Sequence, residues 1–336
     1  MIERDPWAEA LAESASLQVS PPRSAGYPDY PVELNAQVLR FLNRFTGSRR
    51  DVVEMWLTRS GRYLDMIQET FEGHGLPTDL AFTAMIESGF NPLAVSRAGA
   101  KGLWQFMAQT ARRYGLRVDR WVDERLDPDK STRAAAAYFR DLYTQFGSWT
   151  LAQAAYNAGE VAIARAIRKT GSSDFWVLNR TKYLRRETQD FVPAIQAATI
   201  IGRNPERYGF DAAEASPRDH EQVKVPPKTD LRHLARASGL SFTTLRSLNP
   251  VLVRGVTPPG DSWELKVPAG AGDNIAAALA KRHRAAPKGG VHVVRARETV
   301  SSIAKHYGVS ISDVLRWNSL TARALIHPGD RLRIAE

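Results

Sequence analysis

Apolar residues recur at intervals of three and four positions from residue 31 to about residue 210, which is the period of amphipathic α-helices. No segment before residue 220 alternates between apolar and polar residues as a half-buried strand would. The pattern therefore predicts one nearly all-α domain at residues 31–210. Residues 1–30 have little periodicity and contain Pro21, Pro22, Gly26 and Pro28, so we expect a loose leader there.

The rest of the chain contains an internal repeat. Each copy begins and ends with a short apolar strand and has two short helical segments between them, which predicts βααβ modules at residues 223–268 and 291–335. Residues 211–222 are acidic and polar and predict a linker, and residues 269–290 predict a second linker with a short helical stretch. Residues identical in the two copies include Ala235, Gly239, Ser241 and Asn249, which recur as Ala304, Gly308, Ser310 and Asn318.

One ionisable residue, Glu87, follows an apolar run from Leu80 to Ile86 that is typical of a buried helix. Thr78 is the expected N-cap of this helix, and Gly89 is its expected C′ residue. Glu87 would then lie in the last turn, where the helix dipole and apolar neighbours both disfavour a charged carboxylate. We therefore expect a raised pKa, and a protonated carboxyl group can protonate the leaving oxygen of a glycosidic bond. The alternative is a structural glutamate paired with an arginine.

The chain has 336 residues, a formal net charge of +10 and no cysteine. The charge suggests a polyanionic partner, either a nucleic acid or a carboxylate-rich bacterial cell wall, but the scattered charges do not decide between them. The lack of cysteine excludes disulfides, thiolate metal sites and cysteine nucleophiles. The seven histidines form no metal-binding motif and no phosphate-binding or dinucleotide-binding motif is present, so the sequence predicts neither a metal nor another cofactor.

Four motifs follow one another along the predicted helical domain. They are ESGFNP from Glu87, SRAGAKGLWQFM from Ser96, AYNAG from Ala155 and ETQDFVP from Glu187. In this order they resemble the catalytic domain of soluble-type lytic transglycosylases of the membrane-bound lytic murein transglycosylase D type, over roughly residues 35–210. The repeated modules resemble LysM domains, the second closely and the first in a degenerate form. The resemblance implies an α-helical catalytic domain with a lysozyme-like fold, followed by small α+β LysM modules.

The resemblance also implies a mechanism with one carboxylate. Glu87 would protonate the glycosidic oxygen and then take the proton of the muramic acid O6 hydroxyl as a 1,6-anhydro ring closes. Ordinary glycosidases use a second carboxylate. Glu160 starts a helix, where an acidic residue is simply favoured, and Glu187 follows Arg185 and Arg186 in what we interpret as a solvated charge cluster.

Six further residues match substrate-site positions of the family. Ser96 would position the sugar acetamido group, with a loop cap as the alternative. Met107 would line the site or belong to the core, and Asn157 would bind the substrate or Glu87, or cap its helix. Phe191 stands where the family usually has tyrosine, so the phenol donor is missing and activity would be reduced. The whole predicted set is Ser96, Gln105, Met107, Tyr156, Asn157 and Phe191, of which Tyr156 also fits a core position.

The implied substrate is the peptidoglycan glycan strand, cleaved at the β-1,4 bond between MurNAc and GlcNAc. The LysM modules would recognise GlcNAc in a chitin-like manner, and no nucleic acid is expected. Such an enzyme acts in the periplasm or cell envelope, with association with the outer membrane left open. Residues 1–20 show no export signal, and no run reaches transmembrane length. Two alternatives remain: a lysozyme-like peptidoglycan hydrolase, and a catalytically weak cell-wall-binding protein.

Overall fold

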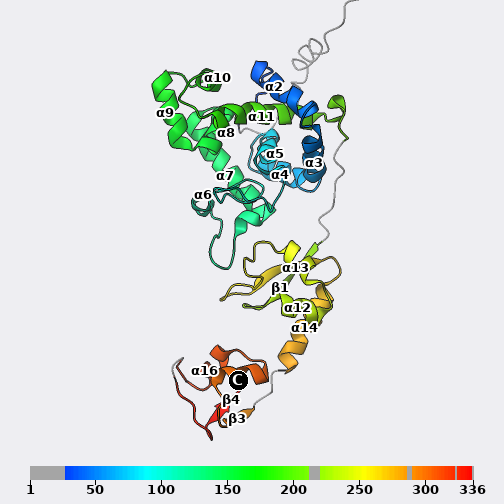
Figure 1. The fold of residues 1–336 in the computed structure, drawn as a ribbon, viewed down its shortest axis with the longest axis vertical. Coiled ribbons are helices and arrows are strands. Elements are labelled where there is room, and N and C mark those ends of the chain that lie inside the picture. Colours follow the sequence, from blue (N-terminus) through cyan, green and yellow to red (C-terminus); the bar gives the residue numbers. More distant parts are fainter. Residues whose placement is uncertain (1–26, 212–219, 286–289, 322–323, 335–336) are drawn as a thin grey trace, which may run out of the picture. The chain divides into compact units, whose positions relative to one another are not determined.

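The computed structural model describes residues 27–211, 220–285, 290–321 and 324–334. The chain divides into two compact units, Met1–Arg218 and Asp219–Glu336. The first unit is helical, and the second contains two small modules built from strands and helices (Figure 1). Within the described ranges, no helix combines the length and the apolar character that are needed to cross a membrane.

The helical unit consists of helices joined by loops with isolated β-bridges, so the nearly all-α prediction is confirmed. Its longest helix, α7 (Pro128–Phe146), begins where the Asp127 side chain accepts a hydrogen bond from the Lys130 amide, with Pro128 in the first turn. The other helices are, in chain order, α2 (Ala36–Thr46), α3 (Arg50–Ser60), α4 (Leu64–Gly73), η1 (Thr78–Ala81), α5 (Phe82–Ser88), α6 (Ala108–Arg113), η2 (Glu124–Leu126), α8 (Trp149–Ala158), α9 (Glu160–Thr170), α10 (Phe175–Asn179), α11 (Arg186–Arg203) and η3 (Glu206–Tyr208).

Helix α11 joins separate parts of the helical unit, because it packs against α2, α5 and α8 (Figure 1). Helix α7 packs against α4 and α8. Three fully buried aromatic rings lie in this core, with Trp104 stacked on Phe71 at 5.4 Å between centroids and edge-on to Phe139 at 6.2 Å. Buried rings supply large apolar areas, so Trp104 anchors the loop that carries it to the core.

The helix that carries Glu87 is shorter than predicted. Residues Thr78–Ala81 form the 3₁₀ turn η1, and α5 starts only at Phe82. The N-cap of η1 is Pro77, which makes no side-chain capping hydrogen bond, so Thr78 is not the cap that the sequence predicts. The neighbouring Asp79 pairs with Arg203 at 2.7 Å, which ties this turn to the end of α11.

The chain already packs against the helical unit before α2. The Tyr30 side chain is buried, and its hydroxyl donates a hydrogen bond to Gln153 Oε1 at 2.8 Å. Trp149 Nε1 donates to the Pro28 carbonyl oxygen at 3.0 Å. Residues 27–30 therefore differ from the predicted loose leader, because their aromatic side chains bury apolar surface. Residues 1–26 of that leader lie outside the described part of the chain.

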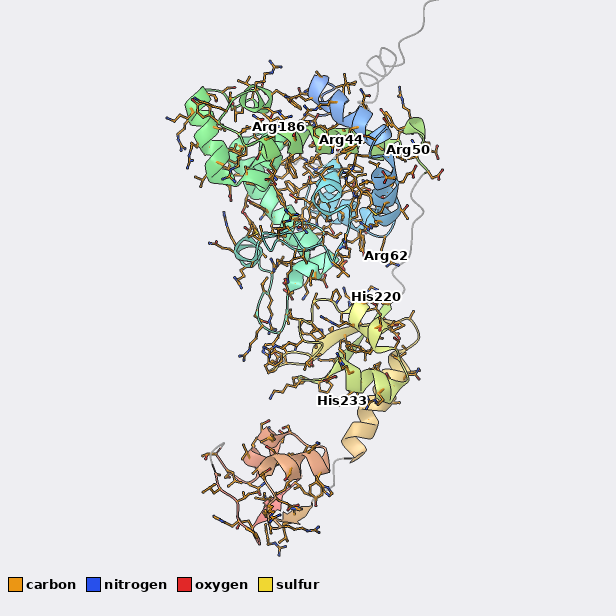
Figure 2. The ribbon with its side chains drawn as sticks, viewed as in Figure 1. Arg44, Arg50, Arg62, Arg186, His220 and His233 are labelled. Carbon is orange, nitrogen blue, oxygen red and sulfur yellow. The ribbon has the colours of Figure 1, made fainter. Side chains whose placement is uncertain are left out.

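The end of the helical unit is held on α3. The guanidinium of Arg50, labelled in Figure 2, lies 4.4 Å from the centroid of the Phe210 ring. Its Nη1 also donates to the Tyr208 carbonyl oxygen at 3.3 Å. A cation–π contact of this kind supports the packing of the segment that contains η3 and Phe210.

Both modules have the predicted βααβ order. In each, two antiparallel strands enclose two short helices. The first module contains β1 (His220–Val225), α12 (Leu231–Ser238), α13 (Phe242–Leu248) and β2 (Trp263–Pro268). The second contains β3 (Val291–Val293), α15 (Val300–Tyr307), α16 (Ile311–Trp317) and β4 (Arg331–Arg333).

A repeated asparagine makes the same contact in both modules. Asn249 Oδ1 accepts a hydrogen bond from the Lys266 amide at 3.0 Å, and Asn318 Oδ1 accepts one from the Arg333 amide at 2.7 Å. In each case the asparagine Nδ2 donates to the carbonyl oxygen of the same strand residue. The repeat seen in the sequence therefore reflects a shared connection between the second helix and the closing strand.

At residues 269–290 the predicted helical stretch is present, but it is longer than expected and is not part of a free linker. Helix α14 (Gly272–Ala285) packs against α12 and β1. Ile275 and Ala278, three residues apart, are buried, so the helix adds an apolar face to this module. Strand β1 likewise begins inside the other predicted linker, residues 211–222.

Candidate active site

Glu87 lies in the last turn of α5, after the fully buried Ala84 and Met85. The helix ends as predicted at Gly89, whose φ of 60° is left-handed, and a Cβ there would collide with the Trp56 ring. Among the residues that the structure describes, none forms a hydrogen bond or ion pair with the Glu87 carboxyl group. The alternative of a structural glutamate paired with an arginine does not fit these surroundings.

The electrostatics of Glu87 match the expected direction. Burial, with a smaller contribution from the negative charge of Glu187, raises the pKa of Glu87 to about 8. An ionised carboxylate is poorly solvated when it is buried without donors or cations. Near neutral pH the group is therefore mainly protonated, so it can donate a proton and then act as a base.

Contacts between side chains and backbone connect the first three motifs. Ser88, next to Glu87, donates through its hydroxyl to the Leu103 carbonyl oxygen at 2.8 Å. Tyr156 donates through its hydroxyl to the Trp104 carbonyl oxygen at 2.7 Å. The end of α5 and the end of α8 are thus both attached to the same loop.

The fourth motif interacts with both the third motif and the first. Thr188 Oγ1 in the first turn of α11 donates to Asn157 Oδ1 at the end of α8, at 2.8 Å. Glu187, next to Thr188, interacts electrostatically with Glu87, so the start of α11 also lies near the end of α5. The four motifs, separated by up to a hundred residues in sequence, therefore meet at one place that includes the protonated glutamate.

Ser96 and Gln105 are held by the backbone of their own loop. The Ser96 hydroxyl accepts a hydrogen bond from the Ala100 amide at 3.0 Å, which is the contact expected of a loop cap. Gln105 has a φ of 46°, and its Nε2 donates to the Ala94 and Gly102 carbonyl oxygens at 3.2 and 2.8 Å. These contacts use the Ser96 hydroxyl oxygen and Gln105 Nε2. The Ser96 hydroxyl can therefore still donate a hydrogen bond to a ligand, and the Gln105 side-chain oxygen can still accept one.

Met107, Tyr156 and Phe191 have different degrees of burial. Met107 is 47% exposed, so it does not belong to the core as one interpretation of the apolar stripe had it. Tyr156 serves the core and the loop together, because its ring stacks on Phe139 at 4.9 Å while its hydroxyl binds the loop. Burial and the charge of Glu87 raise the pKa of Tyr156, which keeps it a donor. Phe191 is buried on α11, at 7% exposure.

Glu187 affects the pKa of Glu87, which its place in a charged run of the sequence did not indicate. It is exposed in the first turn of α11, as expected for a solvated charge, yet it acts on Glu87. The neighbouring Arg186 is paired with Asp190 at 3.0 Å. The only signal in the sequence was its place at the start of the fourth motif.

The described parts of the chain show no metal-binding arrangement. Within them, no group of three or more His, Cys, Asp or Glu side chains could hold a metal ion.

Three family models match the chain. Residues 66–179 match the transglycosylase SLT domain, residues 219–284 the LysM-like domain of lytic transglycosylase MltD, and residues 292–335 the LysM domain. The predicted fold class, a helical domain with a lysozyme-like fold followed by small LysM modules, is confirmed by these matches together with the observed elements.

Several characterised proteins are similar to the chain. Membrane-bound lytic murein transglycosylase D of Escherichia coli strain K12 is 32% identical over 297 residues, which are 82% of this chain and 64% of the relative. The chain thus spans less than two thirds of the length of that relative. The peptidoglycan transglycosylase of Escherichia phage T7 is 39% identical over 101 residues, 29% of this chain and 8% of the relative.

Solved structures also match over part of the chain. The lytic transglycosylase Slt of Pseudomonas aeruginosa, solved as an inactive mutant, covers 44% of this chain over 25% of its own, with 27% identity and a TM-score of 0.37. The motifs in their order, the SLT and LysM matches and the similarity along most of the chain agree with one another. The chain therefore contains a transglycosylase SLT domain followed by two modules of the LysM type.

Proposed function

We propose that this protein is a peptidoglycan lytic transglycosylase that cleaves the β-1,4 bond between MurNAc and GlcNAc and leaves 1,6-anhydro-MurNAc ends. The observation that carries the proposal is the state of Glu87: a carboxyl group with a pKa of about 8 and no partner among the described residues, at the meeting point of the four motifs. The name of the related Escherichia coli enzyme supports the same reaction class.

In this mechanism the proton of the Glu87 carboxyl group moves to the glycosidic oxygen as the bond from that oxygen to C1 of MurNAc breaks. The O6 hydroxyl of the same MurNAc then attacks C1, and its proton passes to the Glu87 carboxylate. The C1–O6 bond closes the anhydro ring and Glu87 returns to its protonated state. No water is consumed, so one carboxylate is enough.

The residues around Glu87 have supporting roles in the proposal. The Ser96 hydroxyl binds the acetamido group of the sugar, and Gln105 and Met107 line the site. Tyr156 holds the loop that carries them, and Asn157, fixed by Thr188, contacts the substrate. Phe191 fills the place of the usual tyrosine without offering a donor.

We propose that the two modules after the helical unit bind the enzyme to peptidoglycan. Lys and Arg outnumber Asp and Glu by almost two to one in residues 219–336, whereas they nearly balance in residues 1–218. Positive modules would bind glycan strands that carry carboxylate-bearing peptides, with GlcNAc as the recognised sugar. We accordingly assign catalysis to residues 31–210, wall binding to the modules, and the site of action to the periplasm or cell envelope.

Analysis of the products from purified sacculi tests this function. The proposal predicts muropeptides with 1,6-anhydro-MurNAc ends, lighter by one water than their reducing counterparts, and release from the Glu87→Gln protein that is slower by about 10²- to 10⁴-fold. The charge of Glu187 near Glu87 favours one rival, a two-carboxylate hydrolase, which would release reducing ends instead. Products with reducing ends whose release depends on Glu87 would show that the protein is this hydrolase instead. If no product is released at all, the alternative of a catalytically weak cell-wall-binding protein would hold.

A further inference from the structure

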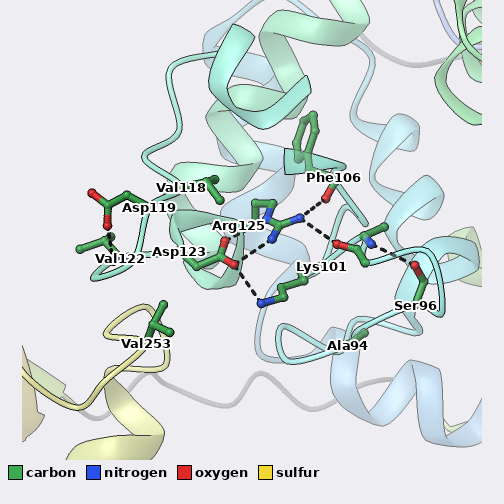
Figure 3. Close-up of polar contacts among 12 residues, drawn as sticks. Ala94, Ser96, Lys101, Phe106, Val118, Asp119, Val122, Asp123, Arg125 and Val253 are labelled. Atoms are coloured by element: carbon green, nitrogen blue, oxygen red, sulfur yellow. Dashed lines mark hydrogen bonds and ion pairs between the residues drawn. The ribbon is translucent and has the colours of Figure 1, made fainter. Parts of the chain in front are cut away.

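A buried ion pair lies outside the four motifs, between the second motif and α7. Arg125 and Asp123 are only 5% and 3% exposed. They form a bidentate pair, with Arg125 Nε 2.9 Å from Asp123 Oδ1 and Nη2 2.8 Å from Oδ2 (Figure 3). Lys101 Nζ lies 3.0 Å from the same Oδ2, so the pair also contacts a side chain of the second motif.

The remaining guanidinium nitrogen of Arg125 binds the backbone of the motif loop. Arg125 Nη1 donates to the Gly99 carbonyl oxygen at 2.9 Å and to the Phe106 carbonyl oxygen at 3.0 Å (Figure 3). These two carbonyl groups lie on either side of Lys101, and the Lys101 amide donates to the same Phe106 oxygen at 3.2 Å. One side chain therefore fixes two points of the loop that presents Ser96 and Gln105.

The backbone of Arg125 also touches this loop. Gly102 has a φ of 83°, and a Cβ at this position would collide with the Arg125 carbonyl oxygen. The loop thus approaches the 123–125 segment closely enough to require glycine. The Arg125 side chain therefore contacts both ends of the Gly99–Phe106 turn, and its backbone contacts Gly102 between them.

The charges of the pair compensate one another. Burial opposes ionisation of Asp123, but hydrogen bonds from Arg125 and Lys101 outweigh it, so the pKa of Asp123 lies below its ordinary value. A buried guanidinium is costly unless its donors are satisfied, and here the carboxylate and two carbonyl oxygens satisfy them. A lysine could not supply the same fork of donors.

We propose that Asp123 and Arg125 are positioning residues for the substrate loop. The pair holds Ser96 and Gln105 in the geometry that the glycan strand requires, acting through the backbone at Gly99 and Phe106 without touching the substrate. This inference rests on the proposed function for its effect on turnover, but its effect on the loop can be measured independently. Binding groups must be held by surroundings that are themselves fixed, and this loop has only turns and isolated bridges of its own.

Hydrogen exchange of the full-length protein tests the effect on the loop without any substrate. Arg125→Lys should speed exchange of the Lys101 and Gly102 amides about 10- to 100-fold, because charge-assisted hydrogen bonds to the loop are lost. Arg203→Lys is the matched control, since it breaks a bidentate pair with Asp79 in the same unit but away from this loop. Unchanged exchange in Arg125→Lys, or equal acceleration in the control, would overturn the proposal.

A double-mutant cycle on turnover tests the effect on function. Arg125→Lys should lower the rate of anhydromuropeptide release about 10- to 100-fold, and its effect should shrink in a Ser96→Ala background, because both changes act through the same contact. Arg203→Lys should combine independently with Ser96→Ala. Effects of Arg125→Lys and Ser96→Ala that multiply fully would contradict positioning through this loop.

The outcomes separate the two proposals. Failure of the wild-type protein to release any product, with accelerated loop exchange in Arg125→Lys, would refute the proposed function and retain the structural role of the pair. Normal turnover with no change in exchange would refute the positioning role alone. Where Arg125→Lys does not fold, Asp123→Asn takes its place, because the amide keeps the shape and one acceptor oxygen.

Discussion

Glu87 in the helical unit and Glu298 in the second module are the same side chain in opposite surroundings. Glu298 accepts a hydrogen bond from the Arg295 amide at 2.7 Å and lies 2.6 Å from His292 Nε2, and these contacts lower its pKa. Glu87 has no such donor among the described residues, and burial raises its pKa to about 8. Glu87 is only partly exposed and lies beside apolar residues, so the fold limits the solvation of its carboxyl group without supplying the partners that a structural carboxylate receives.

The two glutamates also affect stability with opposite signs. The folded protein keeps the Glu87 proton up to about pH 8, whereas the unfolded chain loses it near the ordinary value of 4.5. The contribution of Glu87 to the free energy of unfolding is therefore fully present below pH 4.5 and falls as the pH rises to 8, by at most about 1.4 kcal/mol per pH unit. The contribution of Glu298 is present above its ordinary pKa and is lost as the pH falls through its lowered value.

The largest effect is expected from Glu87→Gln. The amide keeps the shape of the side chain but cannot donate the required proton, so turnover should fall about 10²- to 10⁴-fold. The fall in stability between pH 5 and 8 should disappear as well, because the titrating group is gone. Rates of anhydromuropeptide release and denaturant titrations at several pH values measure the two effects, and undiminished turnover would contradict the assignment of Glu87.

A smaller effect is expected from Glu187→Gln, which removes a negative charge that acts on Glu87. The pKa of Glu87 should decrease, so the alkaline limb of the pH–rate profile should move to lower pH. Glu160→Gln is the matched control, because Glu160 pairs with Arg113 at 3.0 Å and does not contribute to the pKa of Glu87. A loss of turnover as large as that of Glu87→Gln would make Glu187 a second catalytic carboxylate and favour the hydrolase.

The smallest effect on catalysis is expected from Glu298→Gln. Turnover of soluble glycan strands should change by less than about twofold, since the residue lies outside the unit that carries Glu87 and independent sites do not couple. Hydrogen exchange in residues 291–307 should become faster near neutral pH, because the contacts with Arg295 and His292 are weakened. Slower turnover of soluble strands would show that the second module takes part in the chemistry.

The sequence was informative wherever a feature depends on neighbouring residues. The apolar run before Glu87 and the glycine after it were enough to predict the end of a buried helix and a raised pKa, and the structure shows both. The asparagines of the repeat were likewise visible as Asn249 and Asn318. In these cases the local pattern determines the surroundings of the residue.

Features that depend on distant backbone groups could not be predicted. Arg125 binds the carbonyl oxygens of Gly99 and Phe106, and every residue has such an oxygen, so the contact leaves no signal in the sequence. Glu187 looked like part of a solvated cluster, because only the fold brings the start of α11 to Glu87. A short helical stretch was predicted where α14 lies, but its packing was not, because its few buried residues have meaning only against the first module.

The central claim, that Glu87 holds a proton at neutral pH, is tested most directly by a carbon-13 NMR titration of the glutamate carboxyl groups, with the Glu87 signal assigned by its absence in Glu87→Gln. A midpoint of about 8 is the predicted result. A midpoint near the ordinary value of 4.5 would show that Glu87 is ionised under working conditions and would contradict its role as the acid.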